Sequence, residues 1–487
     1  MFNDVATRAP MTVFRNAHRP ADFWPYRMAL WRWAAAHPLK IVFVLALLVR
    51  LINLALLKGN DAFFAEQDTI DYWALGAALA NPDTFFPTLL SMTSRMPLYP
   101  LLLAIVQNTV GDIPRGVALI QAVIDAGTCT LIAALGALIS PLVGLIAGIL
   151  AALSVTLIVF STQILTDTLF LFFFTLMLLC GARFLLRPTN RVALFAGLSG
   201  GLALATRPVV AVLLAGAVPL IFFIVIAKRR SFVRALAAAM LFALAAAAPI
   251  APVLLRNAVY YESFSVTSQA GGHLALWIVP LVTQRANGTP YQTTAHRVEA
   301  RYQQRLAERG LSAESNPFRR AAVETEVARE EMAHLPPAAF AKAWLEGAVV
   351  NLAAPALLVD PRVRTLPKPS FYNTAGATLW EKARSYIFDD PGFYQVILVF
   401  GLIATLPFLV LEAIGFAMLA RALPWGAVFA GGVLAYFLLV NGPVATPKYR
   451  LPMEPVLIVL TAIPLGRFAT RRNSPSGPRW ITTMRKD

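Results

Sequence analysis

Long apolar segments recur along this 487-residue chain and constrain its fold more than any other feature. Most are roughly 20 residues long, which is the length that an α-helix needs to cross a hydrocarbon core of about 30 Å. Hydrophobic residues make up 58% of the chain and charged residues only 14%. A soluble fold could not cover that much apolar surface with polar groups. We therefore expect an all-α polytopic membrane protein.

Basic residues between the apolar segments set the expected topology, because they remain on the cytoplasmic side. The segment at 97–111, PLYPLLLAIVQNTVG, is short for a span, and counting it as one would place the basic groups around Arg187 and Arg230 outside. We predict instead that it is an amphipathic helix along the outer interface. Ten spans then leave both chain ends inside. They cover residues 39–57, 115–137, 142–160, 165–186, 189–206, 208–227, 232–255, 392–418, 422–440 and 451–469.

These spans divide the chain into five parts. We expect a cytoplasmic N-terminal arm (1–38), a transmembrane module (39–256) with its first outer loop at 58–114, a periplasmic loop domain (257–391), C-terminal transmembrane helices (392–469) and a basic cytoplasmic tail (470–487). The loop domain is rich in charge and proline, so several short helices are expected there. The patterns predict helices at about 296–309 and 317–334 and an interfacial helix within 340–359.

The composition excludes several classes of function. The net charge of +16 comes from basic residues beside the apolar segments, so we expect no nucleic-acid partner. Cys129 and Cys180 lie inside apolar segments and are expected to be buried small hydrophobes. We find no cleaved signal peptide, phosphate-binding Walker loop, haem or zinc ligand set, or Ser-His-Asp arrangement.

The candidate active site is the first outer loop, around EQDTIDYWALGAALANPDTFFPTLLSMTSRMPLYPLLLA. It contains acidic Asp68 and Asp71, aromatic Tyr72 and basic Arg95. The topology places Asp167, at the outer end of its span, on the same membrane face. Each aspartate has an alternative interpretation as a helix cap. Two carboxylates on one face favour a functional interpretation of the pair.

Several further residues are candidates for substrate binding. Arg50 lies in the outer half of the first span, where a charge is costly, so we expect a loop carboxylate or a lipid phosphate as its partner. His273 follows two glycines that allow close approach of a ligand, but a lone loop histidine is more often structural or solvated. The others lie at span ends on the outer face, where they either hold an anionic headgroup or extend toward the interface; they are Arg207, Arg256, Asn257, Lys448, Tyr449 and Arg450.

Several stretches together resemble the GT-C superfamily of membrane glycosyltransferases, in particular the bacterial relatives of protein O-mannosyltransferases and of lipid A aminoarabinose transferases. The stretches that carry the resemblance are DTIDYWALGAAL, RMPLYPLLLA, LTDTLFLF, GLSGGLALATRP, LLRNAVYYESFSVTSQAGGHL, NPFRRAAVETEVAREE and PKYRLPMEPVLIVLTA. The resemblance implies that Asp68 is the base or acceptor-orienting carboxylate. It also implies that Asp167 is a second acidic position across the same cavity, where it could help Asp68 to bind a divalent metal ion. Arg95 lies one position from where the aminoarabinose transferases have a lysine.

The resemblance implies transfer of a sugar from a polyprenyl-phosphate donor to a hydroxyl of an envelope glycan, lipid or protein. The phosphate is then the leaving group, which basic side chains can stabilise while a carboxylate accepts the hydroxyl proton. The expected enzyme is a monomer in the bacterial inner membrane with its active site facing the periplasm. The alternative is a flippase or transporter of the lipid-linked sugar, which internal repeats and charges at the bilayer midplane would favour.

Overall fold

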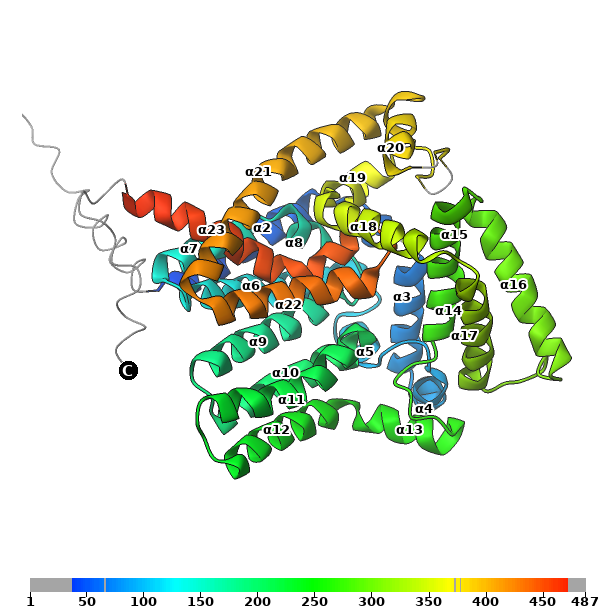
Figure 1. Cartoon of the computed structure of the whole chain (residues 1–487), viewed down its shortest axis with the longest axis horizontal. Helices are drawn as coiled ribbons and strands as arrows, with labels where there is room; N and C mark the ends of the chain where they lie inside the picture. Colours follow the sequence, from blue (N-terminus) through cyan, green and yellow to red (C-terminus); the bar gives the residue numbers. More distant parts are fainter. Residues whose placement is uncertain (1–36, 65–66, 372–373, 377, 472–487) are drawn as a thin grey trace, which may run out of the picture.

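The computed structural model describes residues 37–64, 67–371, 374–376 and 378–471, and the regular elements within them are helices (Figure 1). The predicted N-terminal arm and basic C-terminal tail lie almost entirely outside these residues. Within the described part of the chain, eight helical segments are long and apolar enough to cross a bilayer. This confirms the predicted all-α membrane fold, while the count of ten spans stays a prediction.

The eight segments coincide with predicted spans. They are α2 (Pro38–Leu56), α6 (Pro114–Ala137), α9 (Asp167–Leu186), η2 with α11 (Pro208–Ala227), α12 through α13 (Phe232–Tyr261), α21 (Phe393–Ala422), α22 (Pro424–Asn441) and η6 with most of α23 (Pro447–Phe468). Within these composite segments, α11 is Ala211–Ala227, α12 is Phe232–Ala247, α13 is Ala251–Tyr261, η6 is Pro447–Met453 and α23 is Glu454–Arg471.

The predicted span at 142–160 is wrong as a single helix. The chain forms α7 (Pro141–Leu153) and then a separate short helix, α8 (Val155–Phe160). Between them, the Ser154 hydroxyl accepts a hydrogen bond from the backbone N–H of Leu157 and caps the second helix. With 13 residues, α7 is about 20 Å long, so it is too short to cross the hydrocarbon core alone.

Close helix packing explains the glycines of GLSGG. They lie on α10 (Asn190–Thr206), the predicted span at 189–206, which packs against both α9 and α12. A Cβ on Gly197 would lie 2.3 Å from the carbonyl oxygen of Phe242, and one on Gly201 would lie 2.4 Å from that of Ala246. Only glycine allows α12 to approach this closely. At 17 residues, α10 is near the lower limit for a span.

The first outer loop folds into the short 3-10 helix η1 (Asp61–Phe63) and three α-helices beside the bundle. The α-helices are α3 (Gln67–Ala80), α4 (Pro82–Ser91) and α5 (Leu98–Val110). With 13 residues, α5 is about 20 Å long, which agrees with the prediction that this segment does not cross the membrane. It packs against α3 at Gly76, where a Cβ would lie 2.6 Å from that of Leu103. Its position at the interface stays a prediction.

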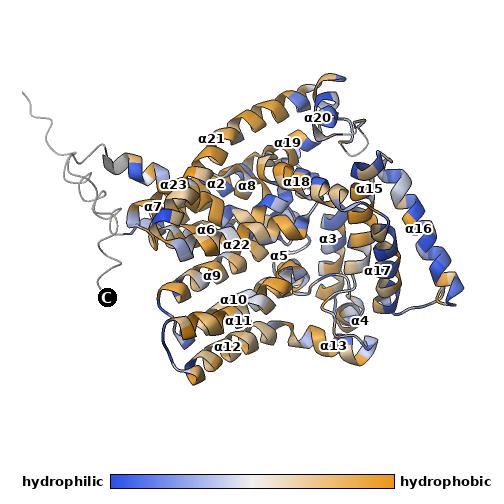
Figure 2. Cartoon of the chain, viewed as in Figure 1, coloured by the Kyte–Doolittle hydropathy of each residue, from blue (hydrophilic) through white to orange (hydrophobic). Residues whose placement is uncertain are grey.

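The loop domain contains short helices, as predicted. They are α14 (Ala270–His273), the π-helical turn η4 (Leu274–Ile278), α15 (Val279–Asn287), α16 (Tyr291–Glu308), α17 (Pro317–Ala333), α18 (Pro337–Ala353), η5 (Ala356–Val359), α19 (Pro361–Arg364) and α20 (Leu379–Phe388). The two helices predicted from the charge pattern are confirmed as α16 and α17. Arginines of α16 pair with glutamates of α17 along this hairpin. Figure 2 shows both helices as largely hydrophilic, in contrast to the apolar bundle.

Helix α18 fixes the connection between α22 and η6. The Asn351 side chain is fully buried; it donates to the carbonyl of Val444 at 3.0 Å and accepts from the backbone N–H of Thr446 at 3.1 Å. A Cβ on Gly347 would lie 2.1 Å from the carbonyl oxygen of Gly442, so the two backbones touch. The loop domain therefore positions the start of η6.

Candidate active site

Asp68 lies at the centre of a charge cluster built from three distant segments. It is in the first turn of α3, and Arg95, which precedes α5, places Nη2 2.6 Å from its Oδ1. Lys448 of η6 places Nζ 3.6 Å from its Oδ2. The Asp68 side chain remains 36% exposed, so a ligand can reach it. Asp71 is a weaker second partner of Arg95, at 3.4 Å.

The Tyr72 ring packs against the Arg95 side of this cluster. The Arg95 guanidinium carbon lies 5.2 Å from the centre of the Tyr72 ring, in a cation–π contact. The ring of Tyr99 packs edge-on against Tyr72 with a centroid separation of 5.5 Å. The buried Tyr99 hydroxyl donates to Gln121 Oε1 at 2.8 Å. Two tyrosines packed edge to face therefore hold Arg95 in place.

Asp167 forms a second ion pair, with Arg207. Asp167 is buried at the start of α9, and Arg207 at the end of α10 donates to its Oδ1. The Asp167 Oδ2 atom is buried without a hydrogen-bond partner among the described residues. The Arg207 guanidinium also lies 5.5 Å from the Phe170 ring centre. One carboxylate oxygen thus remains available to accept a hydrogen bond.

The Tyr72 side chain connects the two ion pairs. It interacts electrostatically with Arg95 and Asp68 on one side and with Arg207 and Asp167 on the other. Arg207 in turn interacts with Tyr449. The structure therefore brings most of the predicted site residues to one end of the bundle; they are Asp68, Asp71, Tyr72, Arg95, Asp167, Arg207, Lys448 and Tyr449.

The charges around Asp68 set its protonation state. Burial raises the pKa of the carboxyl, but Lys448 and Arg95 more than offset this, so its pKa lies below the usual range. Asp68 is accordingly ionised at neutral pH. Burial also raises the pKa of the Tyr72 hydroxyl, which keeps it protonated.

The turn before Asp167 depends on Gln121, which the sequence analysis did not select. Its side chain is fully buried, and its Nε2 donates to the carbonyls of Ser161 at 3.0 Å and Gln163 at 2.8 Å. Gln163 in turn donates to the carbonyl of Val359 in the loop domain at 3.0 Å. The sequence could have indicated Gln121, because a polar residue inside an apolar span usually has a hydrogen-bond partner within the protein.

The partner expected for Arg50 is wrong. Arg50 is fully buried, and its Nε lies 2.6 Å from Asp125 Oδ2 of α6 rather than beside a loop carboxylate or lipid phosphate. It also donates to the carbonyls of Ala151 and Ala152 at the end of α7. These carbonyls belong to the last turn of α7, where the i+4 amide partners of a continuing helix are missing, and Arg50 donates to both of them there. It stabilises the bundle and does not reach the Asp68 cluster.

Arg256 and Asn257 also have internal partners. Arg256 donates to the carbonyls of Leu89 and Met92 at the end of α4 and to Asn257 Oδ1. Asn257 is fully buried and donates to the carbonyl of Ser265. These contacts join α13 to the first outer loop. They occupy the polar atoms that the sequence analysis assigned to a ligand.

Arg450 also has internal partners, whereas its neighbour Lys448 pairs with Asp68. It is buried, with Nη2 2.7 Å from Glu412 Oε1 and Nε 2.8 Å from Glu454 Oε1, and it also donates to the carbonyl of Leu352. Its guanidinium is therefore committed to a buried network. The expectation that it holds a lipid phosphate is not supported by this geometry.

His273 is separate from the cluster. It lies in α14, whose main partner is α17, and none of the contacts found among the described residues joins its side chain to Asp68 or Asp167. Burial lowers the pKa of His273, which keeps the imidazole neutral. This agrees with the alternative given in the sequence analysis, that His273 has a structural role and does not bind a ligand.

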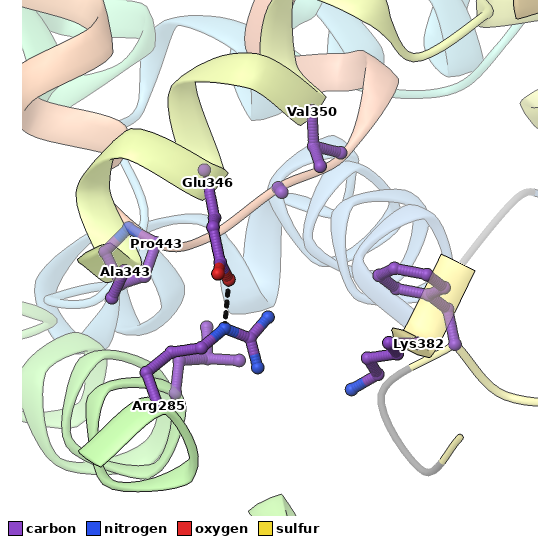
Figure 3. Close-up of a pocket in the computed structure, with 10 residues that line it drawn as sticks. Arg285, Ala343, Glu346, Val350, Lys382 and Pro443 are labelled. Carbon is purple, nitrogen blue, oxygen red and sulfur yellow. Dashed lines mark hydrogen bonds and ion pairs between the residues drawn. The ribbon is translucent and has the colours of Figure 1, made fainter. Parts of the chain in front are cut away.

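A pocket lies between α15, α18 and α20 (Figure 3). Arg285 pairs there with Glu346, and Lys382 lies across the cavity. The cavity measures about 30 Å³, which is enough for about two water molecules but not for a sugar. It is therefore not the donor site.

A resident metal ion does not fit the described residues. No group of three or more His, Cys, Asp or Glu side chains within them could hold an ion. Asp68 and Asp167, the predicted ligands, are each paired with arginine, and Lys448 adds a further positive charge. A divalent cation would have to displace these charges.

Comparison with known proteins finds a similarity to one family over part of the chain. Residues 94–255 match the family model described as dolichyl-phosphate-mannose-protein mannosyltransferase. The match confirms the predicted resemblance and the predicted class, a membrane glycosyltransferase. The matched region includes Arg95, Asp167 and Arg207, whereas Asp68 and Lys448 lie outside it.

A solved structure is also similar to this chain. It is the crystal structure of ArnT from Cupriavidus metallidurans bound to undecaprenyl phosphate, with 14% sequence identity and a TM-score of 0.35. The similarity covers 90% of this chain and 78% of ArnT. No protein of curated function matches the sequence.

Proposed function

We propose that this protein transfers a sugar from a polyprenyl-phosphate-linked donor to a hydroxyl of a cell-envelope glycan, lipid or protein. The reaction takes place on the periplasmic face of a bacterial inner membrane. The observation that carries the proposal is the cluster of Asp68 with Arg95 and Lys448 beside the Asp167–Arg207 pair. The family match over residues 94–255 supports the same chemistry.

The cluster supplies the groups that glycosyl transfer requires. Asp68 accepts the proton of the attacking hydroxyl while the bond from that oxygen to the sugar forms. The bond from the sugar to the phosphate oxygen breaks, and Arg95 and Lys448 stabilise the negative charge that develops there. Both cations form ion pairs with Asp68, so the base and the phosphate site lie within one cluster of paired charges.

The remaining residues of the cluster have positioning roles. Tyr72 orients Arg95 through its ring, and Arg207 fixes one oxygen of Asp167. The unpartnered Asp167 Oδ2 is suited to accept a hydrogen bond from a sugar hydroxyl. Asp71 supplements the negative charge beside Arg95.

The proposal is tested with a synthetic polyprenyl-phosphate sugar labelled in the sugar. Detergent-purified protein is incubated with the donor and an envelope extract, and the products are separated by chromatography. The expected result is labelled acceptor together with sugar-free polyprenyl phosphate. The alternative, a flippase, predicts movement of intact donor across reconstituted vesicles without cleavage, and that result would overturn the proposal.

A further inference from the structure

A second cavity lies at the other end of the bundle, where α9 connects to α10 and α11 connects to α12. It has a volume of about 330 Å³ and is lined by apolar and basic side chains, among them Phe184, Val225, Arg230 and Arg234. That volume falls in the range of small-ligand pockets. It is about ten times larger than the 30 Å³ cavity in the loop domain.

This cavity is remote from the Asp68 cluster. Helix α9 begins at Asp167 and ends at Leu186, so its 20 residues separate the two sites by about 30 Å. Figure 1 shows the α9–α10 and α11–α12 connections at the opposite end of the bundle from the loop domain. A ligand here is independent of the proposed sugar transfer.

Basic side chains are concentrated around the cavity. The sequence contains no Asp or Glu between Asp167 and Glu262. Neither Arg230 nor Arg234 takes part in an ion pair among the residues that the structure describes. Other basic residues of these two connections are Arg183, Arg187, Arg191, Lys228 and Arg229. Together they favour an anion.

The surroundings of the basic side chains are those of a lipid-facing surface. Phe232 and Val233 lie between Arg230 and Arg234 in sequence and are 63% and 74% exposed. Leu236, one turn further along α12, is 46% exposed. Exposed apolar side chains beside a basic cavity suit a molecule with a charged headgroup and acyl chains. Basic residues that only orient the spans would not require a cavity.

We propose that this cavity binds the headgroup phosphate of an anionic phospholipid. Arg230 and Arg234 contact the phosphate, and the acyl chains lie along the exposed apolar face of α12. Each basic residue near an anionic lipid surface contributes about a fivefold change in affinity, so two contribute about 25-fold.

The test compares lipid binding by native mass spectrometry and by thermal unfolding of full-length protein in a neutral detergent. Phosphatidylglycerol, phosphatidylcholine and inorganic phosphate are titrated separately. Arg230→Gln/Arg234→Gln is the test variant. Arg329→Gln/Arg384→Gln is the matched control, because it removes the same charge from exposed positions in the loop domain. Arg230→Lys/Arg234→Lys keeps the charge.

Wild type and the matched control are expected to retain phosphatidylglycerol in preference to phosphatidylcholine. The glutamine variant should bind it about 25-fold more weakly, and the lysine variant should keep most of the affinity. If the double glutamine variant does not fold, Arg234→Gln alone, with about a fivefold loss, decides the question. Equal phosphatidylglycerol binding by the glutamine variant overturns the proposal. Equal stabilisation by inorganic phosphate also overturns it, because the cavity is then a site for free phosphate.

Discussion

The guanidinium of Arg95 lies 2.6 Å from the Asp68 carboxylate and faces the ring of Tyr72. This arrangement holds a cation that can bind a phosphate against a carboxylate that can accept a proton. Because the two groups lie on different helical segments, α3 and the turn before α5, their contact depends on how these segments pack. Substitutions on either side of this pair test the proposed chemistry.

Asp68→Asn should lower turnover about 10²- to 10⁴-fold, because the amide cannot accept the hydroxyl proton. The protein should remain folded, since the side chain is partly exposed. Sugar transfer from the synthetic donor is measured with monodisperse protein. Asp83→Asn, at an exposed position in the same loop, is the control and should keep wild-type turnover. Near-wild-type turnover of Asp68→Asn would reassign the base to Asp71 or Asp167.

Arg95→Met should move the acid limb of the pH–rate profile to higher pH. Arg95 helps to keep the Asp68 pKa low, and burial alone would raise it. Asp68 in the variant therefore becomes protonated, and inactive as a base, at a higher pH than in the wild type. The measurement is kcat against pH for both proteins. An unchanged acid limb would mean that Asp68 does not control activity.

Arg50→Leu should destabilise the bundle by about 3–5 kcal/mol, because it leaves Asp125 as an unpaired buried charge. Asp125→Leu should have a similar effect, and the double variant should lose less than the sum of the two. Thermal unfolding in detergent measures these changes. Additive losses would show that the two residues do not act as a pair.

Asn351→Leu should reduce sugar transfer although Asn351 does not contact the charge cluster. It removes both hydrogen bonds that hold the segment from Val444 to Thr446, and Lys448 follows directly. The expected loss of stability is about 1–3 kcal/mol, because two backbone groups lose their partner. Donor binding and turnover should both decrease. Unchanged turnover would show that η6 is positioned without α18.

The buried Lys382 should make the loop domain more stable as pH rises above about 8. Burial lowers the pKa of its ammonium group to about 8, below that of an unfolded lysine. Between that pH and about 10.4 the unfolded chain binds more protons, so this lysine favours folding increasingly as pH rises. Lys382→Met should raise the melting temperature at pH 7. It should also remove the increase in stability that this lysine causes above about pH 8. Melting curves between pH 7 and 10 measure both effects.

The sequence by itself determined the membrane class, most of the spans and the loop helices. Segments of about 20 apolar residues have few stable folds other than a spanning helix. The Arg and Glu patterns of α16 and α17 were similarly sufficient to predict two helices. Asp68 and Asp167 were also selected from sequence, since carboxylates beside apolar spans are costly without a role.

Only the tertiary structure decided which charged residues face the site. Arg50, Arg256 and Arg450 are basic residues near span ends, as Lys448 is, but they point to backbone carbonyls and buried carboxylates. At the break in the predicted span at 142–160, the last carbonyls of α7 accept hydrogen bonds from Arg50, a residue about 100 positions away. Sequence patterns report burial and helix period, whereas the partner of a charge depends on contacts between segments that are distant in the chain.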